Sequence, residues 1–325
     1  MPSPLSSPGR RLLLQMTLAG LLPAAAHAQA VFGPSEAPVA PALSLVVLGS
    51  GGPAANGRAG AGYLLLLDGV PRILLDAGPG AFARLGEAQL SLARVDTVLL
   101  THLHADHAGG LPGLVKARAV SGGGPAEFRV FGPGGRPARK GPGGGAYFPS
   151  TRRFIDLLFG PQGAFAYLSQ FSAPLHFSVR DVAASTREPL TLLSGPGLQI
   201  QAVAGHHRDA PSVIFRVDYQ GHSITFSGDI DPAGHEALWR LAQGSQWLVF
   251  NSVVLDPPGS PEILYSLHTA PRDIGRLADQ AGVGHLLLSH LNPSIERHEP
   301  EVRASIAEHF KGPVLMARDG LALTL

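Results

Sequence analysis

Apolar residues in this chain gather in short runs, and most of the runs end at glycine, proline or a polar residue. Such runs are typical of buried β-strands. They predict strands at residues 44–48, 62–67, 72–75, 95–100, 128–131, 198–203, 212–219, 222–226, 247–250, 285–289, 313–316 and 321–325. Asp68-Gly69 and Gln220-Gly221 are placed to turn the chain between neighbouring strands, as hairpin turns do.

Amphipathic stretches between these runs predict helices at residues 81–89, 108–119, 233–243, 269–281 and 301–310. Strands and helices alternate in two halves, and the strands of both halves end in polar residues. This order predicts an α/β sandwich with a functional site at one rim of the sheets. Residues 149–167 predict a helix that either covers part of a groove or packs on the core. With the Gly- and Pro-rich loop at 132–145, this segment is expected to set selectivity.

The first residues have the pattern of a signal peptide. Arg10 and Arg11 precede an apolar run at 12–22 that is too short to span a bilayer, and Ala26-His27-Ala28 offers a cleavage site. We predict a signal peptide at 1–28, a Pro- and Ala-rich linker at 29–42 and one folded domain at 43–325. The expected location is periplasmic or secreted, with no membrane span after cleavage. An amphipathic N-terminal helix is the alternative.

The amino-acid composition excludes several kinds of binding surface and metal site. The net charge is +1, from 25 basic and 24 acidic residues, which argues against a general nucleic-acid-binding surface. Cysteine is absent, so the chain has no disulfide, no thiolate nucleophile and no cysteine metal ligand. Any metal ion must therefore be bound by His, Asp or Glu.

The stretch from Thr101 to Gly110 follows the predicted strand at 95–100 and concentrates metal-binding side chains. His102 and His104 are two residues apart, so on an extended chain they face one point. Asp106 and His107 fall where the chain turns into a helix and can serve a neighbouring point. Imidazoles and a carboxylate at this density suit zinc-like divalent ions. The alternative is a polar loop with scattered histidines.

Other predicted strands also end in residues that can bind metal, namely Asp76, His206 with His207, Asp229, and His290. Together with the first cluster, they suffice for two ions. One ion would take His102, His104 and either His206 or His207. The other would take Asp106, His107 and His290. Asp229 would bridge the ions with one oxygen on each, and such a pair, about 3.5–4 Å apart, holds a hydroxide at neutral pH.

These residues, in this order, resemble the metallo-β-lactamase superfamily over residues 43–325. The resemblance implies a four-layer αβ/βα sandwich, the metallo-β-lactamase fold, with a dinuclear and usually zinc centre. It implies that Asp76 anchors the metal loop without being a ligand. It favours His207 over His206, because Pro211 opens the following strand four residues later. The implied ligands are His102, His104, Asp106, His107, His207, Asp229 and His290.

Several short motifs resemble one branch of that superfamily, which contains ribonuclease Z, arylsulfatase-type enzymes and some cyclic-nucleotide phosphodiesterases. They are Gly49–Pro53, Asp76–Gly80, Gly110–Leu114, Phe131–Pro133 and Leu287–Leu291. In ribonuclease Z-like members, a histidine at the position of His268 helps to protonate the leaving group or binds the phosphate. Those members pair it with a glutamate, and this chain has Asn251 there. A neutral amide can orient an imidazole but cannot raise its pKa, so the acid role of His268 stays open.

The expected function is that of an exported dinuclear zinc hydrolase. It would cleave a small anionic ester, a phosphodiester or a sulfate ester, by metal-bound hydroxide, with Asp106, Asp229 and His268 as the catalytic residues. A lactonase or β-lactamase, a tRNA 3′-endonuclease-like enzyme and an iron oxidoreductase are the alternatives. Nucleic acid is expected to be an unlikely partner. A homodimer agrees with the resemblance, but the sequence does not fix the oligomeric state.

Overall fold

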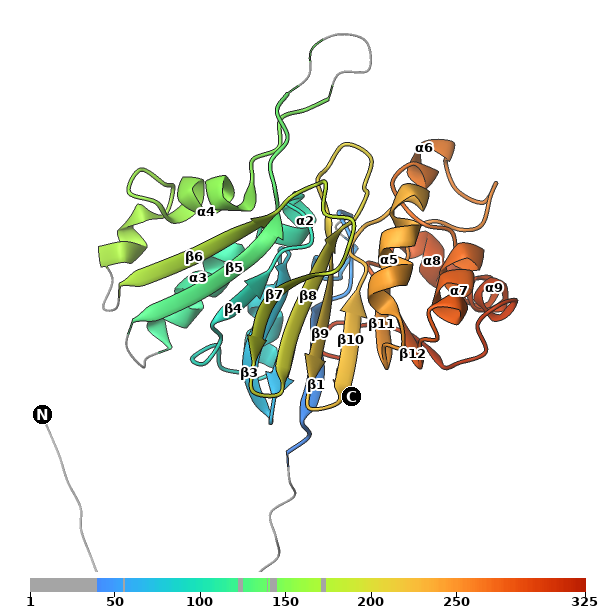
Figure 1. Cartoon of the computed structure of the whole chain (residues 1–325), viewed down its shortest axis with the longest axis horizontal. Coiled ribbons are helices and arrows are strands. Elements are labelled where there is room, and N and C mark those ends of the chain that lie inside the picture. Colours follow the sequence, from blue (N-terminus) through green and yellow to red (C-terminus); the bar gives the residue numbers. More distant parts are fainter. Residues whose placement is uncertain (1–39, 55, 122–124, 139, 141–144, 171–173) are drawn as a thin grey trace, which may run out of the picture. The chain divides into compact units, whose positions relative to one another are not determined.

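The computed structural model describes residues 40–325, except positions 55, 122–124, 139, 141–144 and 171–173. The predicted signal peptide, residues 29–39 of the predicted linker and part of the 132–145 loop lie outside the described residues. The described chain forms two sheets that pack face to face, with helices on both outer faces (Figure 1). Within this part, no helix is long and apolar enough to cross a membrane.

The first sheet has seven strands in the order β14-β1-β2-β3-β4-β5-β6. In that order they are Ala322–Thr324, Leu43–Gly49, Gly62–Leu67, Val70–Ala77, Thr97–Leu99, Ala126–Pro133 and Leu175–Val182. The strands from β3 to β6 are parallel. The carboxyl ends of β3 and β4 therefore lie at the same edge of this sheet.

The second sheet also has seven strands, in the order β13-β12-β11-β10-β9-β8-β7. In that order they are Val314–Met316, His285–Ser289, Trp247–Asn251, His222–Phe226, Val213–Tyr219, Leu198–Ala204 and Leu190–Gly195. The strands from β10 to β13 are parallel, and β9 is antiparallel to both β10 and β8. As a result, β8, β10, β11 and β12 all end at one edge.

Helices cover the outer faces of both sheets. On the first sheet pack α1 (Ala81–Glu87), α3 (Leu111–Val120) and α4 (Thr151–Phe159). On the second pack α5 (His235–Ala242), α7 (Pro271–Gln280) and α9 (Glu299–Ala307). The shorter helices are α2 (Ala105–Ala108), η1 (Ala166–Gln170), η2 (Pro232–Gly234), α6 (Glu262–Tyr265) and α8 (Pro293–Arg297).

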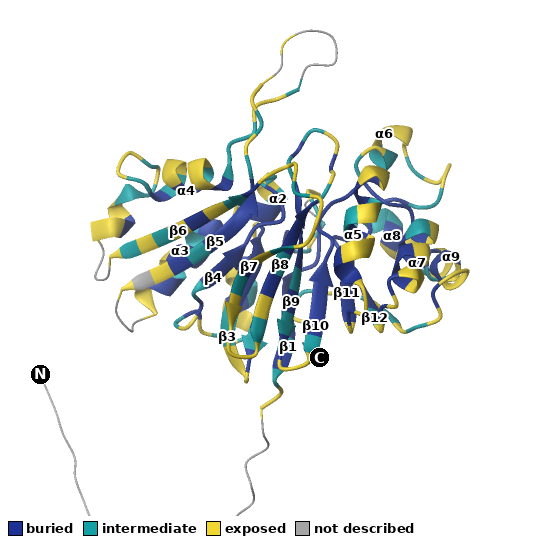
Figure 2. Ribbon diagram, in the orientation of Figure 1, coloured by how far each residue is buried: buried dark blue, intermediate teal, exposed yellow. Residues whose placement is uncertain are grey.

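The central core lies between the sheets. Leu45 and Ile73 of the first sheet belong to the same buried cluster as Phe215 and Phe226 of the second. Figure 2 shows the inner strands buried and the outer helices exposed on their far sides. Because each sheet is covered on both faces, its central strands are nearly continuous apolar runs, which is why the sequence revealed them. The four layers confirm the predicted αβ/βα sandwich.

Some elements differ from the sequence prediction. The strands β6 and β7 were not predicted, because they are only partly buried and alternate polar with apolar residues. The predicted helix at 108–119 corresponds to α3, which begins only at Leu111; the short helix α2 precedes it, and Gly109 and Gly110 separate the two. The predicted helix within 149–167 is α4. It packs on the outer face of the first sheet through Ile155 and Phe159, as the core interpretation expected.

Candidate metal centre

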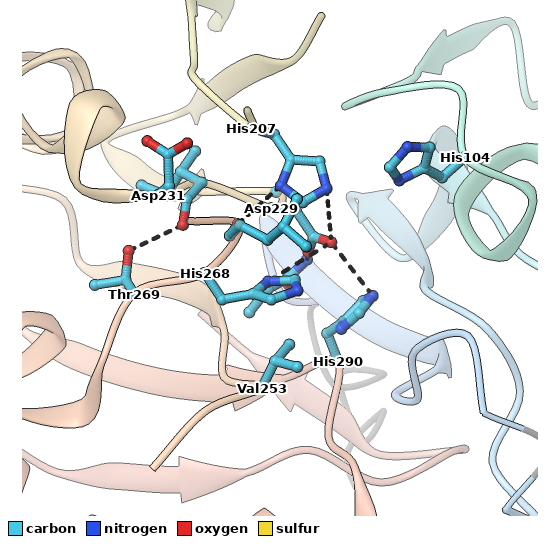
Figure 3. A network of polar contacts seen from close by, with 12 residues as sticks. His104, His207, Asp229, Asp231, Val253, His268, Thr269 and His290 are labelled. Carbon is cyan, nitrogen blue, oxygen red and sulfur yellow. Dashed lines mark hydrogen bonds and ion pairs between the residues drawn. The ribbon is translucent and has the colours of Figure 1, made fainter. Parts of the chain in front are cut away.

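The strand ends that carry the predicted site residues meet at one edge of the sandwich. Asp76 lies at the end of β3, and the loop with His102 and His104 follows β4. His207 follows β8, Asp229 follows β10 and His290 follows β12. Figure 3 shows His207, His268 and His290 arranged around Asp229. The two halves of the sequence thus supply one common site.

Asp76 ties the histidine-rich loop to the end of β3. One of its oxygens accepts a hydrogen bond from the Thr101 backbone N–H at 2.7 Å. The other accepts from the Thr101 hydroxyl at 2.7 Å and from His107 Nδ1 at 2.8 Å. Because a carboxylate only accepts, His107 carries its proton on Nδ1 and turns Nε2 toward the cluster. This is the anchoring position expected of Asp76.

Two glycines let the loop approach the sheet closely. A Cβ atom on Gly60 or Gly78 would lie 2.5 or 2.2 Å from the Asp106 carbonyl oxygen, closer than van der Waals contact allows. Any side chain at either position would push this backbone away. The position of Asp106 therefore depends on these two residues as well as on its own helix.

Metal-binding atoms converge in two neighbouring groups. The first contains His102, His104 and His207, and the second contains Asp106, His107 and His290. In the first, His102 Nε2 and His104 Nδ1 are 3.1 Å apart. In the second, His290 Nε2 and His107 Nε2 lie 3.1 and 3.7 Å from Asp106 Oδ2. Within each group, the ligand atoms lie within 4.8 Å of one another, close enough to share one ion.

The carboxylate of Asp229 lies between the two groups. Its Oδ2 atom is 3.7 to 3.9 Å from the Nε2 atoms of His102, His107, His207 and His290. Its Oδ1 atom accepts a hydrogen bond from the Asn251 amide at 2.7 Å. The expected arrangement had one carboxylate oxygen of Asp229 on each ion. The structure instead places Oδ2 alone toward the histidines, because Asn251 occupies Oδ1.

The two adjacent histidines have different surroundings. His207 is 3% exposed, and its Nδ1 donates a hydrogen bond to the Leu267 carbonyl at 2.8 Å, which leaves Nε2 free to face the cluster. The side chain of His206 is 50% exposed, and its Nδ1 lies 2.7 Å from Asp231 Oδ2. Only His207 joins the groups of metal-binding atoms. No pattern in the sequence indicated the contact between His206 and Asp231.

The electrostatics of the site favour a cation. Burial alone would raise the pKa of the Asp229 carboxyl, but the surrounding imidazoles, His290 first and then His107, bring it well below its usual range. Burial lowers the pKa of His102 well below its ordinary value, and His107 lowers it further. Burial alone would lower the pKa of His107, but the charges of Asp76 and Asp229 raise it to about 9. The carboxylates thus create a negative potential inside a buried site.

The donor set fits divalent metal ions. His107 Nε2 is buried without a hydrogen-bond partner among the described residues. His102 Nε2 and His104 Nδ1 are 3.1 Å apart, so these ring nitrogens either share a hydrogen bond or bind one ion together. Divalent ions that accept imidazole and carboxylate ligands, one in each group, would satisfy these atoms. Hydrogen bonds donated by His107 to Asp76 and by His207 to the Leu267 carbonyl orient these two imidazoles, as expected around a metal.

His268 lies beside this centre, but Asn251 does not orient it. His268 Nδ1 is 3.9 Å from Asp229 Oδ2 and has no hydrogen-bond partner among the described residues. The Asn251 amide donates to Asp229 at 2.7 Å. Burial lowers the pKa of His268 to about 4, although the Asp229 charge partly opposes this. Among the described residues, no carboxylate lies within hydrogen-bond distance of His268 to hold a proton on it for a leaving group, since Asp229 Oδ2 is 3.9 Å away.

The geometry agrees with a known family. The Metallo-beta-lactamase superfamily profile matches residues 57–266, which include the histidine-rich loop, His207 and Asp229. The chain belongs to the metallo-β-lactamase superfamily. The predicted superfamily is thus confirmed, and with it the assignment of the chain as a metal-dependent hydrolase.

Several proteins that are similar to this chain are named for an activity. A ribonuclease Z from Mycobacterium avium (strain 104) is 28% identical over 285 residues, covering 85% of this chain and 96% of the relative. A ribonuclease Z from Mycobacterium marinum is 27% identical over 292 residues, with the same two coverages. The solved structure of human tRNase Z, short form, aligns with a TM-score of 0.65 and 21% identity. It covers 86% of this chain and 98% of that one.

The expectation that nucleic acid is an unlikely partner of this superfamily member is wrong in the light of these relatives. They are named for ribonuclease activity, and the similarity spans most of both chains. The expectation rested on a net charge of +1. A net charge averages over the whole surface, whereas binding of an anion depends on the basic groups near the site.

Proposed function

We propose that this chain is an exported dinuclear zinc hydrolase that cleaves phosphodiesters or related anionic esters. The observation that carries the proposal is the placement of Asp229 Oδ2 at nearly equal distances, 3.7 to 3.9 Å, from imidazoles of both ligand groups. A single carboxylate oxygen in this position can contact two ions at once. With a single ion, one of the two groups of protein ligands would have no ion to bind.

The proposed metal ligands form two groups, one for each ion. One ion would be bound by His102, His104 and His207, the other by Asp106, His107 and His290, and both by Asp229. When bound, such an ion pair supplies a water-derived nucleophile at neutral pH and positive charge that stabilises the attacked ester. Zinc is the metal that these imidazole and carboxylate ligands suit best in a chain without cysteine.

The remaining roles belong to the protein itself. Asp106 and Asp229 would help to hold the ions and could accept a hydrogen bond from a bound water. We assign His268 to substrate contact, because its pKa of about 4 leaves it neutral at pH 7. A neutral imidazole can accept or donate one hydrogen bond to an ester oxygen without adding charge.

The names of similar proteins support a phosphorus ester as the substrate, and nucleic acids belong to this substrate class. Named relatives are ribonuclease Z proteins, and a neighbouring fold belongs to a diphosphatase from the PhnP family with a TM-score of 0.56. Hydrolysis of a lactone or a β-lactam would use the same ions on a carbonyl carbon. No observation at this site favours it over a phosphodiester.

The test is a substrate panel on the mature zinc-loaded protein, with its metal content measured. The panel holds bis(p-nitrophenyl) phosphate, p-nitrophenyl sulfate, a 3′-extended tRNA, nitrocefin and an acyl-homoserine lactone. We expect two zinc ions per chain and turnover of at least one of the first three. Faster turnover of nitrocefin or the lactone, or one iron per chain, would overturn the proposal.

Export rests on the N-terminal pattern at residues 1–28. A fusion of this segment to a reporter enzyme tests it in a bacterial host. We expect the reporter outside the cytoplasm with the segment present and inside without it. A cytoplasmic reporter in both cases would remove export from the proposal.

Replacing Asn251 with alanine should weaken metal binding about tenfold, as loss of a hydrogen bond to a ligand does elsewhere. The amide keeps Asp229 Oδ1 occupied and so aims Oδ2 at the histidines. Zinc affinity is measured by competition with a chromogenic chelator. The control is Ser252→Ala, because the neighbouring Ser252 hydroxyl is buried without a described partner. Equal affinities of the Asn251→Ala variant and the wild type would show that the amide does not orient Asp229.

A further inference from the structure

A cavity adjoins the candidate metal centre. It has a volume of about 830 Å³, and its wall includes both His206 and His207. His207 also points its Nε2 into the metal-binding cluster, 3.7 Å from Asp229 Oδ2. The cavity and the cluster therefore share one residue. A substrate group bound in the cavity would lie next to the cluster.

A buried carboxylate fixes the wall of this cavity. Asp231 is 5% exposed, and its Oδ2 atom accepts hydrogen bonds from His206 Nδ1 at 2.7 Å and from the Arg208 backbone N–H at 2.9 Å. Its Oδ1 atom accepts from the Ala233 backbone N–H at 2.9 Å. One carboxylate thus positions the residues on both sides of His207. The ring atom of His206 left for a ligand is Nε2.

The charges on the cavity wall leave two arginines for a ligand. Arg136 is paired with Asp209, which it contacts at 2.7 Å. Arg240 is paired with both Glu188 and Glu236. By contrast, the guanidinium groups of Arg187 and Arg208 form no ion pair with any residue described, although Arg187 donates to the Ala184 carbonyl at 2.6 Å. Three acids therefore neutralise two of the four arginines.

The backbone at Arg208 is also unusual. Its φ angle is +50°, in the left-handed region that non-glycine residues rarely adopt. The hydrogen bond from its N–H to Asp231 helps to hold this conformation. Strain of this kind persists where the surrounding structure fixes it, and it gathers at binding sites. The side chain of Arg208 is exposed on the cavity wall.

We propose that this cavity is a subsite for a second phosphate group of the substrate, adjacent to the phosphodiester that is cleaved. Arg208 binds this phosphate by charge-assisted hydrogen bonds, and His206 adds a contact from Nε2. The inference rests on the proposed function and deepens it. It makes the substrate a nucleotide or oligonucleotide with two neighbouring phosphates, in preference to a simple aryl ester.

The experiment uses two matched pairs of ligands on the full zinc-loaded chain. Thymidine 3′,5′-bisphosphate and thymidine 5′-monophosphate are compared for binding by calorimetry. The p-nitrophenyl esters at the 5′-phosphate of the same two nucleotides are compared for turnover. We expect at least tenfold tighter binding of the bisphosphate and a lower KM for the ester that carries the 3′-phosphate.

Arg208→Asn is the informative variant, because asparagine tolerates a left-handed backbone and keeps the N–H that binds Asp231. It should remove the tenfold preference. The affinity and KM for the ligands without a 3′-phosphate should change by no more than about twofold. His206→Ala should reduce the preference in part. Arg276→Gln, which removes an exposed arginine paired with Asp273 on α7, should change nothing.

The outcomes separate the two proposals. If neither ester is turned over but the bisphosphate preference depends on Arg208, the subsite stands and the proposed function fails. If both esters are turned over but wild type and Arg208→Asn show the same preference, the subsite is overturned and the proposed function stands. Inorganic phosphate that binds as tightly as the bisphosphate would show a site for the free ion and would also overturn the subsite.

Discussion

Removal of metal ions should abolish hydrolysis and lower the melting temperature of the mature chain by about 10 °C. The ligand atoms of seven residues belong to the folded site, and they come from both halves of the chain. An unfolded chain cannot bring them together. Ions present at about a thousand times their dissociation constant would stabilise the folded state by about 4 kcal/mol. For a domain near this size, each kcal/mol corresponds to roughly 2–4 °C.

Metal-free protein lacks this link between the two halves of the chain. His107 Nε2 is then buried without a hydrogen-bond partner among the described residues. Differential scanning calorimetry with and without a chelator measures the effect. Zinc should restore both stability and turnover, whereas magnesium, which prefers oxygen ligands and water, should not. A melting temperature unchanged by chelation would contradict a metal centre that links the two sheets.

The sequence revealed most of this site because parallel strands end at one edge of a sheet. Asp76, Asp229 and His290 each follow a buried apolar run, and such runs are recognisable without a structure. Within each sheet, parallel strands place such residues at one edge, which the alternation with helices predicted, and the face-to-face packing of the two sheets brings the two edges together. The half-buried strands β6 and β7 lacked this signal.

Contacts between neighbouring strands were harder to predict, because they depend on register. In the second sheet, Phe226 of β10 pairs with Val249 of β11. This register brings Asn251 beside Asp229, although His268 was its expected partner. A shift of the pairing would place a different residue there. No pattern along a single strand contains that information.

The arrangement of charges around the cavity beside His206 was equally hard to predict from the sequence. Arg136 comes from the loop after β5, Arg187 from the connection before β7 and Arg240 from α5. They are far apart in a sequence whose basic and acidic residues nearly cancel. Only the folded chain places them around one space with Arg208. A prediction about nucleic acid from net charge alone could not include this arrangement.

Replacing Asp76 with asparagine should lower the zinc affinity by 10–100-fold while the chain still folds. The carboxylate accepts three hydrogen bonds, two from Thr101 and one from His107 Nδ1. An asparagine amide offers only one accepting oxygen, and its NH₂ group would face a donor. Asparagine tolerates the left-handed backbone of Asp76, whose φ angle is +52°. The loss should therefore come from the lost acceptor.

Alanine at the same position should have a larger effect on folding. Asp76 is 1% exposed, so its removal leaves buried donors on Thr101 and His107 without acceptors. Removing one partner of a buried charged pair costs roughly 3–5 kcal/mol. In addition, alanine adopts the left-handed conformation less readily than aspartate. Urea unfolding of the metal-free variants measures this difference directly.

The matched control is Asp68→Asn. Asp68 also has a left-handed backbone, with a φ angle of +50°, but it is exposed in the turn between β2 and β3 and bonds Tyr219. Its replacement changes the same atoms in the same backbone conformation away from the metal loop. Zinc affinity should then stay at the wild-type value. If Asp76→Asn also bound zinc with wild-type affinity, the carboxylate would have no part in orienting His107, and the geometry of the loop would have to be maintained by its backbone and the glycines that pack against it.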